Sequence, residues 1–462
     1  MKWQGCKSGC LLIVSACALL LGVARMGSAQ QTANPPASTD TAARTFWYRQ
    51  AKFGMFIHWG PYSLASVEAS WPIMSPNPRW VITEPEYVTL YKQFNPVKFN
   101  PQEWVRLAQD AGMRYMVFTT KHHDGFCMFD TSLTDYKITQ TPYGQDVTAM
   151  LARAAHEANM PLGFYYSPPD MHHPGYRDTS KPVKDTWHGD PARPEWATYL
   201  DYLQAQLREL LTGYGPVAVV WFDGLDHQEK YKGEEVLQLV HQLQPAALVN
   251  NRLGVPGDFA TPEQFIPDRI PTKSVANTLK GLKDAADSGA PAVPAPEDFQ
   301  LWETCMTIND TWAYNKNDTN YKSVKELIQD LANVASKGGN FILDVGPTPE
   351  GTIQPEFVER LQAIGQWMKV YGDSIYGTTY GPLQGLPFGK STAKGHTVYL
   401  HVFDWPSNGQ LEVPGFPGRV VMASVVGDKH KLRFRQEGTD LTVYVPASAP
   451  DASDSVVQVV TK

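Results

Sequence analysis

The sequence contains few cysteines, which excludes a fold that disulfides hold together. It has 462 residues and five cysteines, and only Cys127 and Cys305 lie beyond position 17. Exported proteins that depend on disulfides carry a much higher proportion of cysteine. No Cys or His spacing typical of a zinc site is present. Because both cysteines follow strand-like segments, we expect two buried free thiols.

Clusters of basic residues are also absent. The formal net charge is −7, and no run of Lys or Arg occurs. A nucleic-acid-binding surface requires a positive patch, so we expect no nucleic-acid partner. Aromatic residues are plentiful instead, with 13 Trp, 21 Tyr and 19 Phe. Sugar rings stack on aromatic side chains, so this composition is compatible with carbohydrate binding.

An apolar run long enough to span a membrane is missing. The run Leu11–Ala24 is shorter than the roughly 20 residues that a spanning helix needs. Two lysines precede it and Gly27-Ser28-Ala29 follows it, which is typical of a secretory signal peptide. We predict a signal peptide over residues 1–29 and an exported protein, periplasmic or secreted, with no membrane span. A lipoprotein signal is the less favoured alternative, because little apolar sequence precedes Cys17.

The rest of the chain divides according to its periodicity. Residues 30–43 are rich in Gln, Thr, Ala and Pro and predict a disordered leader. From 44 to 375, strand-like runs alternate with segments of helical periodicity, which predicts an α/β fold with a (β/α)8-like (TIM) barrel. From 376 to 462, period-two alternation between turn residues predicts a C-terminal antiparallel β-sandwich. A segment rich in Pro and Ala, at about 271–297, predicts a long surface loop.

Polar side chains follow most of the predicted barrel strands. Seven strands are clear, so the pattern lacks one strand or helix of a complete barrel. In such barrels the chemistry lies at the carboxyl ends of the strands. We therefore expect one pocket, lined by several strand ends. The strand segments are Phe56–Gly60, Val117–Gly125, Gly163–Ser167, Val217–Gly224, Leu248–Arg252, Leu301–Thr304 and Asn340–Val345.

Asp223 is the leading catalytic candidate, because it ends an apolar strand beside aromatic residues. Asp often caps a helix, but the next helix is predicted to begin only near Gly233, which weakens that alternative. Glycoside hydrolysis needs a second carboxyl group at the scissile bond. Glu303 ends an apolar strand and from its position looks the better partner for Asp223, whereas Glu263 lies in an irregular segment. The residues alone do not choose between these two.

Three histidines follow the first two strands. His122 and His123 are adjacent, so on a strand they would face opposite ways, although at its end both can turn into the pocket. One alternative is metal ligation by His58, His122, His123 and Asp124. Metal hydrolases built on barrels commonly use a His-x-His pair, which is absent. We therefore favour hydrogen bonds from neutral imidazoles to substrate hydroxyls, and expect no metal or other cofactor.

These segments resemble the α-L-fucosidases of glycoside hydrolase family 29. The similarity covers about 44–375, and Lys121-His122-His123-Asp124-Gly125 is its most specific part. It implies a TIM-like barrel with a β-sandwich, and an exo-acting, retaining α-L-fucosidase that acts on a fucosylated oligosaccharide or glycoconjugate. The other similar segments are Lys52–Gly60, Gly163–Ser167, Trp221–Gly224, Asn251–Arg252 and Gly339–Pro347.

The resemblance also implies roles for individual residues. Asp223 matches the family nucleophile and Glu263 the acid/base, with Glu303 as the reserve candidate. An apolar or aromatic wall would accept the 6-methyl group of fucose. Many relatives carry a Glu-Trp pair after the first strand, and Glu68 and Trp71 are the candidates here. The implied sugar contacts are His58, His122, His123, Tyr165, Trp221 and Arg252.

Three alternatives remain open. A related sugar such as an α-L-galactoside could be the substrate, because fucose is 6-deoxy-L-galactose. The chain could be a non-catalytic carbohydrate-binding relative, against which the presence of Asp223 and a candidate acid argues. It could also be a metal-dependent hydrolase, which a chelator would inactivate.

Overall fold

The computed structural model describes residues 41–74, 82–182, 188–224, 228–273 and 293–462. The predicted signal peptide and lipoprotein signal lie outside these ranges, as does most of the predicted surface loop. Helix α1 begins at Thr41, so residues 41–43 of the predicted leader are helical. Within the described ranges, no helix combines the length and apolar character that crossing a membrane requires.

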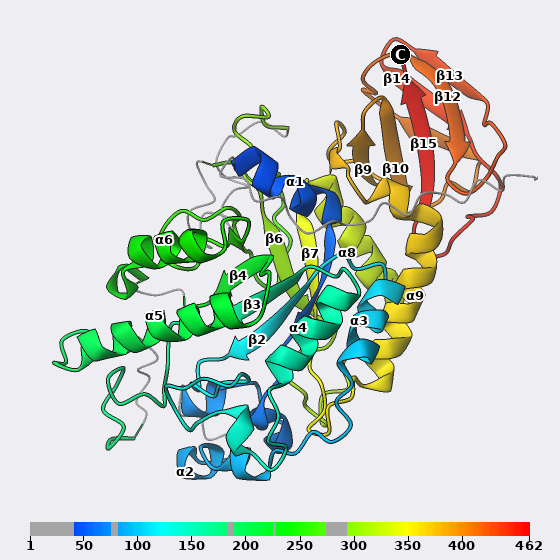
Figure 1. Ribbon diagram of the computed structural model, residues 1–462. Helices are drawn as coiled ribbons and strands as arrows, with labels where there is room; N and C mark the ends of the chain where they lie inside the picture. The colour runs from blue at the N-terminus through cyan, green and yellow to red at the C-terminus, as the bar shows by residue number, and fades with distance from the viewer. Residues whose placement is uncertain (1–40, 75–81, 183–187, 225–227, 274–292) are drawn as a thin grey trace, which may run out of the picture. The chain divides into compact units, whose positions relative to one another are not determined.

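Seven parallel strands form one curled sheet, in the order β5-β4-β3-β2-β1-β7-β6. All seven predicted strands are present, and burial on both faces explains their nearly continuous apolar sequences. Figure 1 shows the larger helices around the outside of this sheet. The strands are β1 (Phe53–Ile57), β2 (Met116–Lys121), β3 (Leu162–Tyr166), β4 (Val219–Phe222), β5 (Leu248–Val249), β6 (Glu303–Thr307) and β7 (Asn340–Val345).

The helices begin where the sequence supplies a capping residue or a proline. The side chain of Asn100 accepts a hydrogen bond from the backbone N–H of Glu103, and Pro101 is the first residue of α3. Ser323 and Glu326 form a capping box at α8. The described helices are α1 (Thr41–Ala51), α2 (Glu84–Tyr87), α3 (Pro101–Asp110), α4 (Val147–Glu157), α5 (Trp196–Gly213), α6 (Gly233–Leu243), α8 (Val324–Ser336) and α9 (Pro355–Tyr371).

A short irregular segment lies between the two edge strands of the sheet, β5 and β6. Phe259 forms a parallel bridge with Asn250 on one side, and Ala260 forms one with Trp302 on the other. The segment Phe259–Glu263 therefore takes the place of the missing eighth strand. A proline within it has no N–H for a regular ladder, which is why the sequence pattern did not predict a strand here.

The prediction that Glu303 ends a strand is wrong. Glu303 is the first residue of β6, because the buried run continues through Cys305, Met306 and Thr307. Its carboxyl group therefore projects near the amino end of the barrel strands rather than at the end where the chemistry is expected. Cys127 and Cys305 are both free and buried, as predicted.

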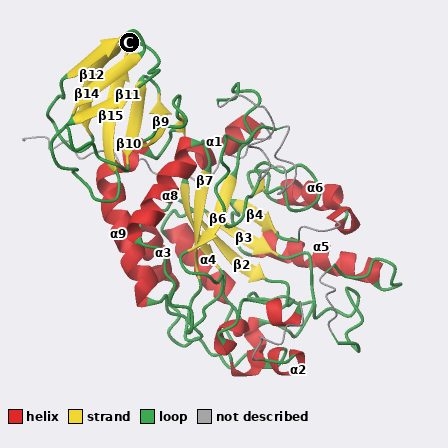
Figure 2. Ribbon diagram, turned by 180° about the vertical axis from the view of Figure 1, so that it is seen from behind, coloured by secondary structure: helices red, strands yellow, loops and turns green. Residues whose placement is uncertain are grey.

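The C-terminal strands form two antiparallel sheets (Figure 2), in the orders β12-β15-β10-β9-β8 and β11-β14-β13. Leu400 and Val457 from one sheet share a buried apolar core with Leu411 and Val443 from the other, which is the predicted β-sandwich. The strands are β8 (Thr379–Tyr380), β9 (Gly389–Lys394), β10 (Thr397–Val402), β11 (Gln410–Val413), β12 (Val420–Val425), β13 (Phe434–Glu437), β14 (Asp440–Tyr444) and β15 (Ser455–Thr461).

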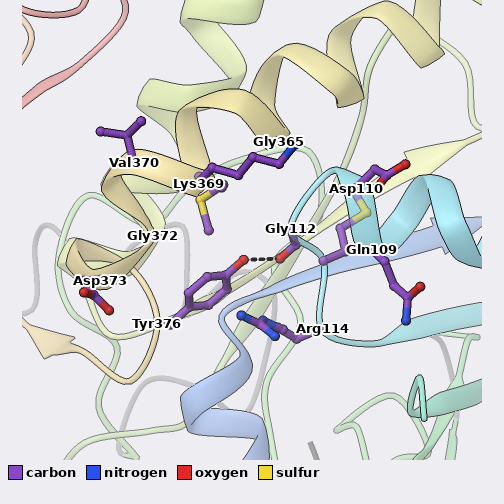
Figure 3. Close-up of a pocket in the computed structure, with 12 residues that line it drawn as sticks. Gln109, Asp110, Gly112, Arg114, Gly365, Lys369, Val370, Gly372, Asp373 and Tyr376 are labelled. Atoms are coloured by element: carbon purple, nitrogen blue, oxygen red, sulfur yellow. Dashed lines mark hydrogen bonds between the residues drawn. The ribbon is translucent and has the colours of Figure 1, made fainter. Parts of the chain in front are cut away.

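A cavity of about 510 Å³ lies between α3 and α9, beside the amino end of β2 (Figure 3). The guanidinium of Arg114 stacks on the ring of Tyr376 at 4.4 Å, and the Tyr376 hydroxyl donates to the carbonyl of Gly112. Asp110 and Lys369 add charges of opposite sign to its lining. The lining includes no residue predicted for the site, and this end of a barrel usually contributes to stability rather than to chemistry.

Candidate active site

The carboxyl ends of the strands bring the predicted site residues together. His58 directly follows β1, and His122 and His123 directly follow β2. Tyr165 lies near the end of β3 and Trp221 near the end of β4, with Asp223 directly after β4. The loop after β5 carries Arg252, and Glu263 ends the segment that replaces the eighth strand.

Asp223 receives hydrogen bonds on both carboxylate oxygens. Its Oδ1 accepts from Arg252 Nη1 at 2.8 Å, and its Oδ2 accepts from the Tyr165 hydroxyl at 2.8 Å. His123 Nε2 lies 3.4 Å from Oδ2. Burial would raise the pKa of Asp223, but the charge of Arg252 and the hydrogen bond from His123 outweigh burial and lower this pKa well below its usual range. Asp223 is therefore held as a carboxylate at neutral pH.

Arg252 joins the two candidate carboxylates through one nitrogen atom. Its Nη1 lies 2.8 Å from Asp223 Oδ1 and 2.9 Å from Glu263 Oε2. The two oxygens can therefore be no more than about 6 Å apart, which agrees with the roughly 5–5.5 Å typical of retaining glycosidases. Thr261 fixes the guanidinium, because its Oγ1 and its carbonyl oxygen both accept hydrogen bonds from Arg252. The Glu263 side chain is 33% exposed, so it faces the open side of the site.

Trp221 forms the floor beneath this arginine. The Arg252 guanidinium lies 4.6 Å from the centre of the Trp221 ring. The ring of Tyr165 stacks on that of Trp221 at 5.6 Å, and the ring of Phe56 lies 5.1 Å away. The Trp221 indole N–H donates to Glu303 Oε1 at 3.0 Å. Glu303 is thus a buried partner of the floor and not a group at the open face. It is 1% exposed, and burial raises its pKa to about 7.

Each of the three histidines has its Nδ1 atom occupied. His58 Nδ1 lies 2.7 Å from Asp344 Oδ1. His122 Nδ1 lies 2.6 Å from Ser70 Oγ, and His123 Nδ1 lies 2.5 Å from Ser167 Oγ. In the part of the chain that the structure describes, no group of three or more His, Cys, Asp or Glu side chains could hold a metal ion.

The turn after β2 directs both adjacent histidines inward. His122 and His123 lie just past the last strand residue, so strand alternation no longer applies, and their ring centres are 4.3 Å apart. Gly125 has φ +76°, and a Cβ added there would lie 2.1 Å from Asp170 Oδ1. The turn therefore requires glycine at this position.

Several residues of the site were not identified from the sequence. Of the two unassigned candidates, Glu68 reaches the site: its carboxylate accepts a hydrogen bond from the backbone N–H of Trp312, and burial raises its pKa to about 7. The Trp312 ring lies 5.0 Å from that of His58. Trp71 instead packs against the hydrophobic core. Ser70, Ser167 and Trp312 carry no local signal, whereas an acid inside the apolar strand β7 could have identified Asp344.

Two neighbouring carboxylates at the carboxyl end of a barrel are the arrangement that glycoside hydrolases use. A family model for α-L-fucosidases matches residues 20–373. The chain is 34% identical to the solved α-L-fucosidase isoenzyme 1 from Paenibacillus thiaminolyticus, with a TM-score of 0.78, and the match covers 92% of this chain and 100% of that one.

Two other relatives agree. A family 29 α-L-fucosidase from Bacteroides thetaiotaomicron, solved as a trapped covalent intermediate with 2-fluoro-fucosyl fluoride in a Glu-to-Gln mutant, is 27% identical with a TM-score of 0.75, covering 91% of this chain and 96% of that one. Human plasma α-L-fucosidase is 29% identical, covering 84% of this chain and 82% of its own length. The chain belongs to the α-L-fucosidase family, glycoside hydrolase family 29, and is a retaining glycoside hydrolase.

Proposed function

We propose that this enzyme removes terminal α-L-fucosyl residues from oligosaccharides or glycoconjugates, with Asp223 as the nucleophile and Glu263 as the acid/base. The observation that carries this proposal is the shared contact of both carboxylates with Arg252 Nη1. Because both contacts share one nitrogen atom, the two carboxylate oxygens can be no more than about 6 Å apart, which supports a double displacement.

The reaction has two balanced steps. In the first, an Asp223 oxygen attacks the anomeric carbon while the glycosidic C–O bond breaks, and the proton of Glu263 passes to the leaving oxygen. In the second, Glu263 takes a proton from water as the water oxygen attacks the anomeric carbon. The bond between the anomeric carbon and Asp223 breaks as the bond to the water oxygen forms, which restores the Asp223 carboxylate and releases fucose with its original anomeric configuration.

Neighbouring groups hold the substrate for this attack. Tyr165 and Arg252 fix the orientation of Asp223 through the hydrogen bonds described above. His58, His122 and Trp221 face the same space, and we assign them to the sugar hydroxyls and ring. The half-buried indole of Trp312, beside His58, supplies an apolar wall for the 6-methyl group.

We further propose that residues 44–375 form the catalytic barrel and 376–462 an accessory sandwich, since every proposed site residue belongs to the first range. The lysine-flanked apolar run of residues 1–29 supports export to the periplasm or beyond the cell.

The decisive test is release of nitrophenol from 4-nitrophenyl α-L-fucoside by wild type, Asp223→Ala and Glu263→Ala, with azide added to each variant. We expect activity in wild type and a large loss in both variants. Azide should restore activity to both variants. The product should be β-fucosyl azide with Asp223→Ala and α-fucosyl azide with Glu263→Ala. Full activity in Glu263→Ala would overturn its assignment, and an inactive wild type on a panel of fucosides would overturn the proposed activity.

A further inference from the structure

Two serine hydroxyls hold the adjacent histidines of the site in opposite ways. Ser70 contacts His122 and Ser167 contacts His123, each through Nδ1. A serine hydroxyl has a single hydrogen to donate. The remaining partners of each serine therefore decide whether it donates to the imidazole or accepts from it.

Ser70 donates to His122. Its Oγ accepts a hydrogen bond from the backbone N–H of Asp124 at 3.0 Å. Among the hydrogen bonds described for Ser70, His122 Nδ1 is the acceptor available to the hydroxyl hydrogen. His122 is then a neutral ring with its proton on Nε2, ready to donate into the pocket. Burial, together with the charges of His123 and His58, lowers the pKa of His122 well below its usual range, in agreement with this state.

The hydrogen bond between Ser167 and His123 runs in the opposite direction, from the imidazole to the hydroxyl. Its hydroxyl hydrogen is directed to the carbonyl oxygen of Pro169 at 2.8 Å. With its hydrogen directed to Pro169, Ser167 accepts from His123, so Nδ1 of His123 carries a proton. The other nitrogen, Nε2, faces Asp223 Oδ2 at 3.4 Å. A neutral ring would turn a lone pair toward that carboxylate, so a proton on Nε2 as well removes the repulsion.

The competing arrangement is a neutral ring with its only proton on Nε2. The Ser167 hydroxyl would then have to turn from Pro169 to His123 Nδ1, and the Pro169 carbonyl oxygen would lose this donor. The charges around the ring oppose that change. Asp223 and Asp124 are carboxylates that interact with His123, and two of the rings packed beside it, those of His122 and Tyr165, are uncharged at neutral pH.

The nearby positive charge of Arg252 does not cancel the negative charge around His123. Its Nη1 is shared between Asp223 and Glu263, so one guanidinium faces two carboxylates. A second cation beside Asp223 is therefore compatible with the charges of the site, even though the His123 side chain is only 7% exposed.

We propose that His123 is an imidazolium ion paired with Asp223 in the resting enzyme, and that Ser167 is the positioning residue that fixes this state. The inference rests on the proposed role of Asp223 as nucleophile for its catalytic meaning. An imidazolium at Oδ2 stabilises the carboxylate before attack, and again when Asp223 leaves the fucosyl-enzyme. It also means that His122, and not His123, is the neutral donor to a sugar hydroxyl.

The test measures protonation directly, without turnover. Enzyme labelled with ¹⁵N-histidine is studied by long-range ¹H–¹⁵N NMR at pH 7, in wild type, Ser167→Ala, Ser167→Thr and Ser70→Ala. We expect His123 to have two protonated nitrogens in wild type. Ser167→Ala should leave one unprotonated nitrogen, whereas Ser167→Thr, which keeps Oγ, should restore the imidazolium. The matched control Ser70→Ala should alter His122 and leave His123 protonated.

A neutron crystal structure of the wild type supplies a second measurement that requires no variant to fold. Deuterium on both ring nitrogens of His123 supports the proposal, and deuterium on one nitrogen overturns it. An imidazolium that persists in Ser167→Ala overturns the role of Ser167. Hydrolysis of the nitrophenyl fucoside by the same wild-type sample decides the proposed function separately, so the two can fail independently.

Discussion

The indole N–H of Trp221 donates to Glu303 at 3.0 Å, on the inner side of the ring that supports Arg252. The other oxygen of Glu303 accepts from the hydroxyls of Tyr48 and Tyr115. A buried carboxylate with three donors thus anchors the aromatic floor, and the floor positions the arginine that joins the two proposed catalytic carboxylates. The role of Glu303 is therefore structural: it is the acceptor that holds the aromatic floor in place.

Glu303→Gln is expected to keep the fucosidase active, whereas Glu303→Leu should unfold more easily. Leucine leaves the donors of Tyr48, Tyr115 and Trp221 buried without an acceptor, and each such group costs about 1–3 kcal/mol. Glutamine keeps an acceptor for Trp221. Denaturant unfolding measures the stability of both variants. Hydrolysis of the nitrophenyl fucoside, with and without azide, measures their activity. Rescue of either variant by azide would contradict the structural role and return Glu303 to the catalytic pair.

The contribution of Glu303 to the stability of the wild type should fall as the pH rises from 5 to 8. Its pKa is about 7 in the folded protein and 4.5 in the reference state. Between these values the folded chain binds a proton that the unfolded chain does not, so unfolding becomes easier as pH increases. The contribution is on the order of 3 kcal/mol.

The Glu303→Gln variant is the control for that slope. Other carboxyls with raised pKa values, Glu68 and Asp344 among them, remain in both proteins and cancel in the comparison. The measured quantity is the difference in free energy of unfolding between wild type and Glu303→Gln at pH 5 and at pH 8. A difference that stays constant between the two pH values would refute the prediction.

The sequence was sufficient for the parts of the fold that depend on local pattern. Asp223 follows an apolar strand, and its alternative role as a helix cap fails because α6 begins only at Gly233. The seven strands and the period-two C-terminal sheets also follow from apolar spacing. The choice of Glu263 over Glu303 came from the resemblance alone, because Glu263 looks like an exposed loop acid.

Non-local contacts explain what the sequence could not supply. The segment ending at Glu263 becomes a barrel element only because β5 and β6 flank it. Ser70 and Ser167 meet histidines that lie 52 and 44 positions away along the chain. An isolated serine has no periodicity to reveal such a partner, so these residues emerge only from the tertiary structure.

Arg252→Lys should lower kcat/KM for the nitrophenyl fucoside roughly 100-fold. A lysine cannot keep both hydrogen bonds to Thr261 while it contacts the two carboxylates, and losing charge-assisted hydrogen bonds of this kind costs about 3 kcal/mol. Arg360→Lys is the matched control, since Arg360 stacks on Tyr321 at 4.9 Å outside the site. Equal effects of the two substitutions on kcat/KM would argue against the bridging role.

Prolonged treatment with a chelator should leave the activity unchanged. The Nδ1 atoms of His58, His122 and His123 are engaged by Asp344, Ser70 and Ser167, and the proposed reaction uses only carboxyl groups and water. The measurement is fucoside hydrolysis after dialysis against EDTA, with and without added Zn²⁺. Loss on dialysis with recovery on Zn²⁺ addition would favour the metal-dependent alternative.

Trp312→Ala should reduce the preference for fucosides over α-L-galactosides. The two sugars differ by a hydroxyl on C6, and an apolar wall that fits a methyl group discriminates by about 1–3 kcal/mol, or roughly tenfold or more. Trp312 is held against His58 by the hydrogen bond from its backbone to Glu68, so the wall is a fixed surface. The ratio of kcat/KM for the two nitrophenyl glycosides should therefore fall towards unity in Trp312→Ala. It should be unchanged in Trp405→Ala, which removes a half-buried indole from the sandwich. A ratio that survives the loss of Trp312 would place the recognition of C6 on another part of the pocket.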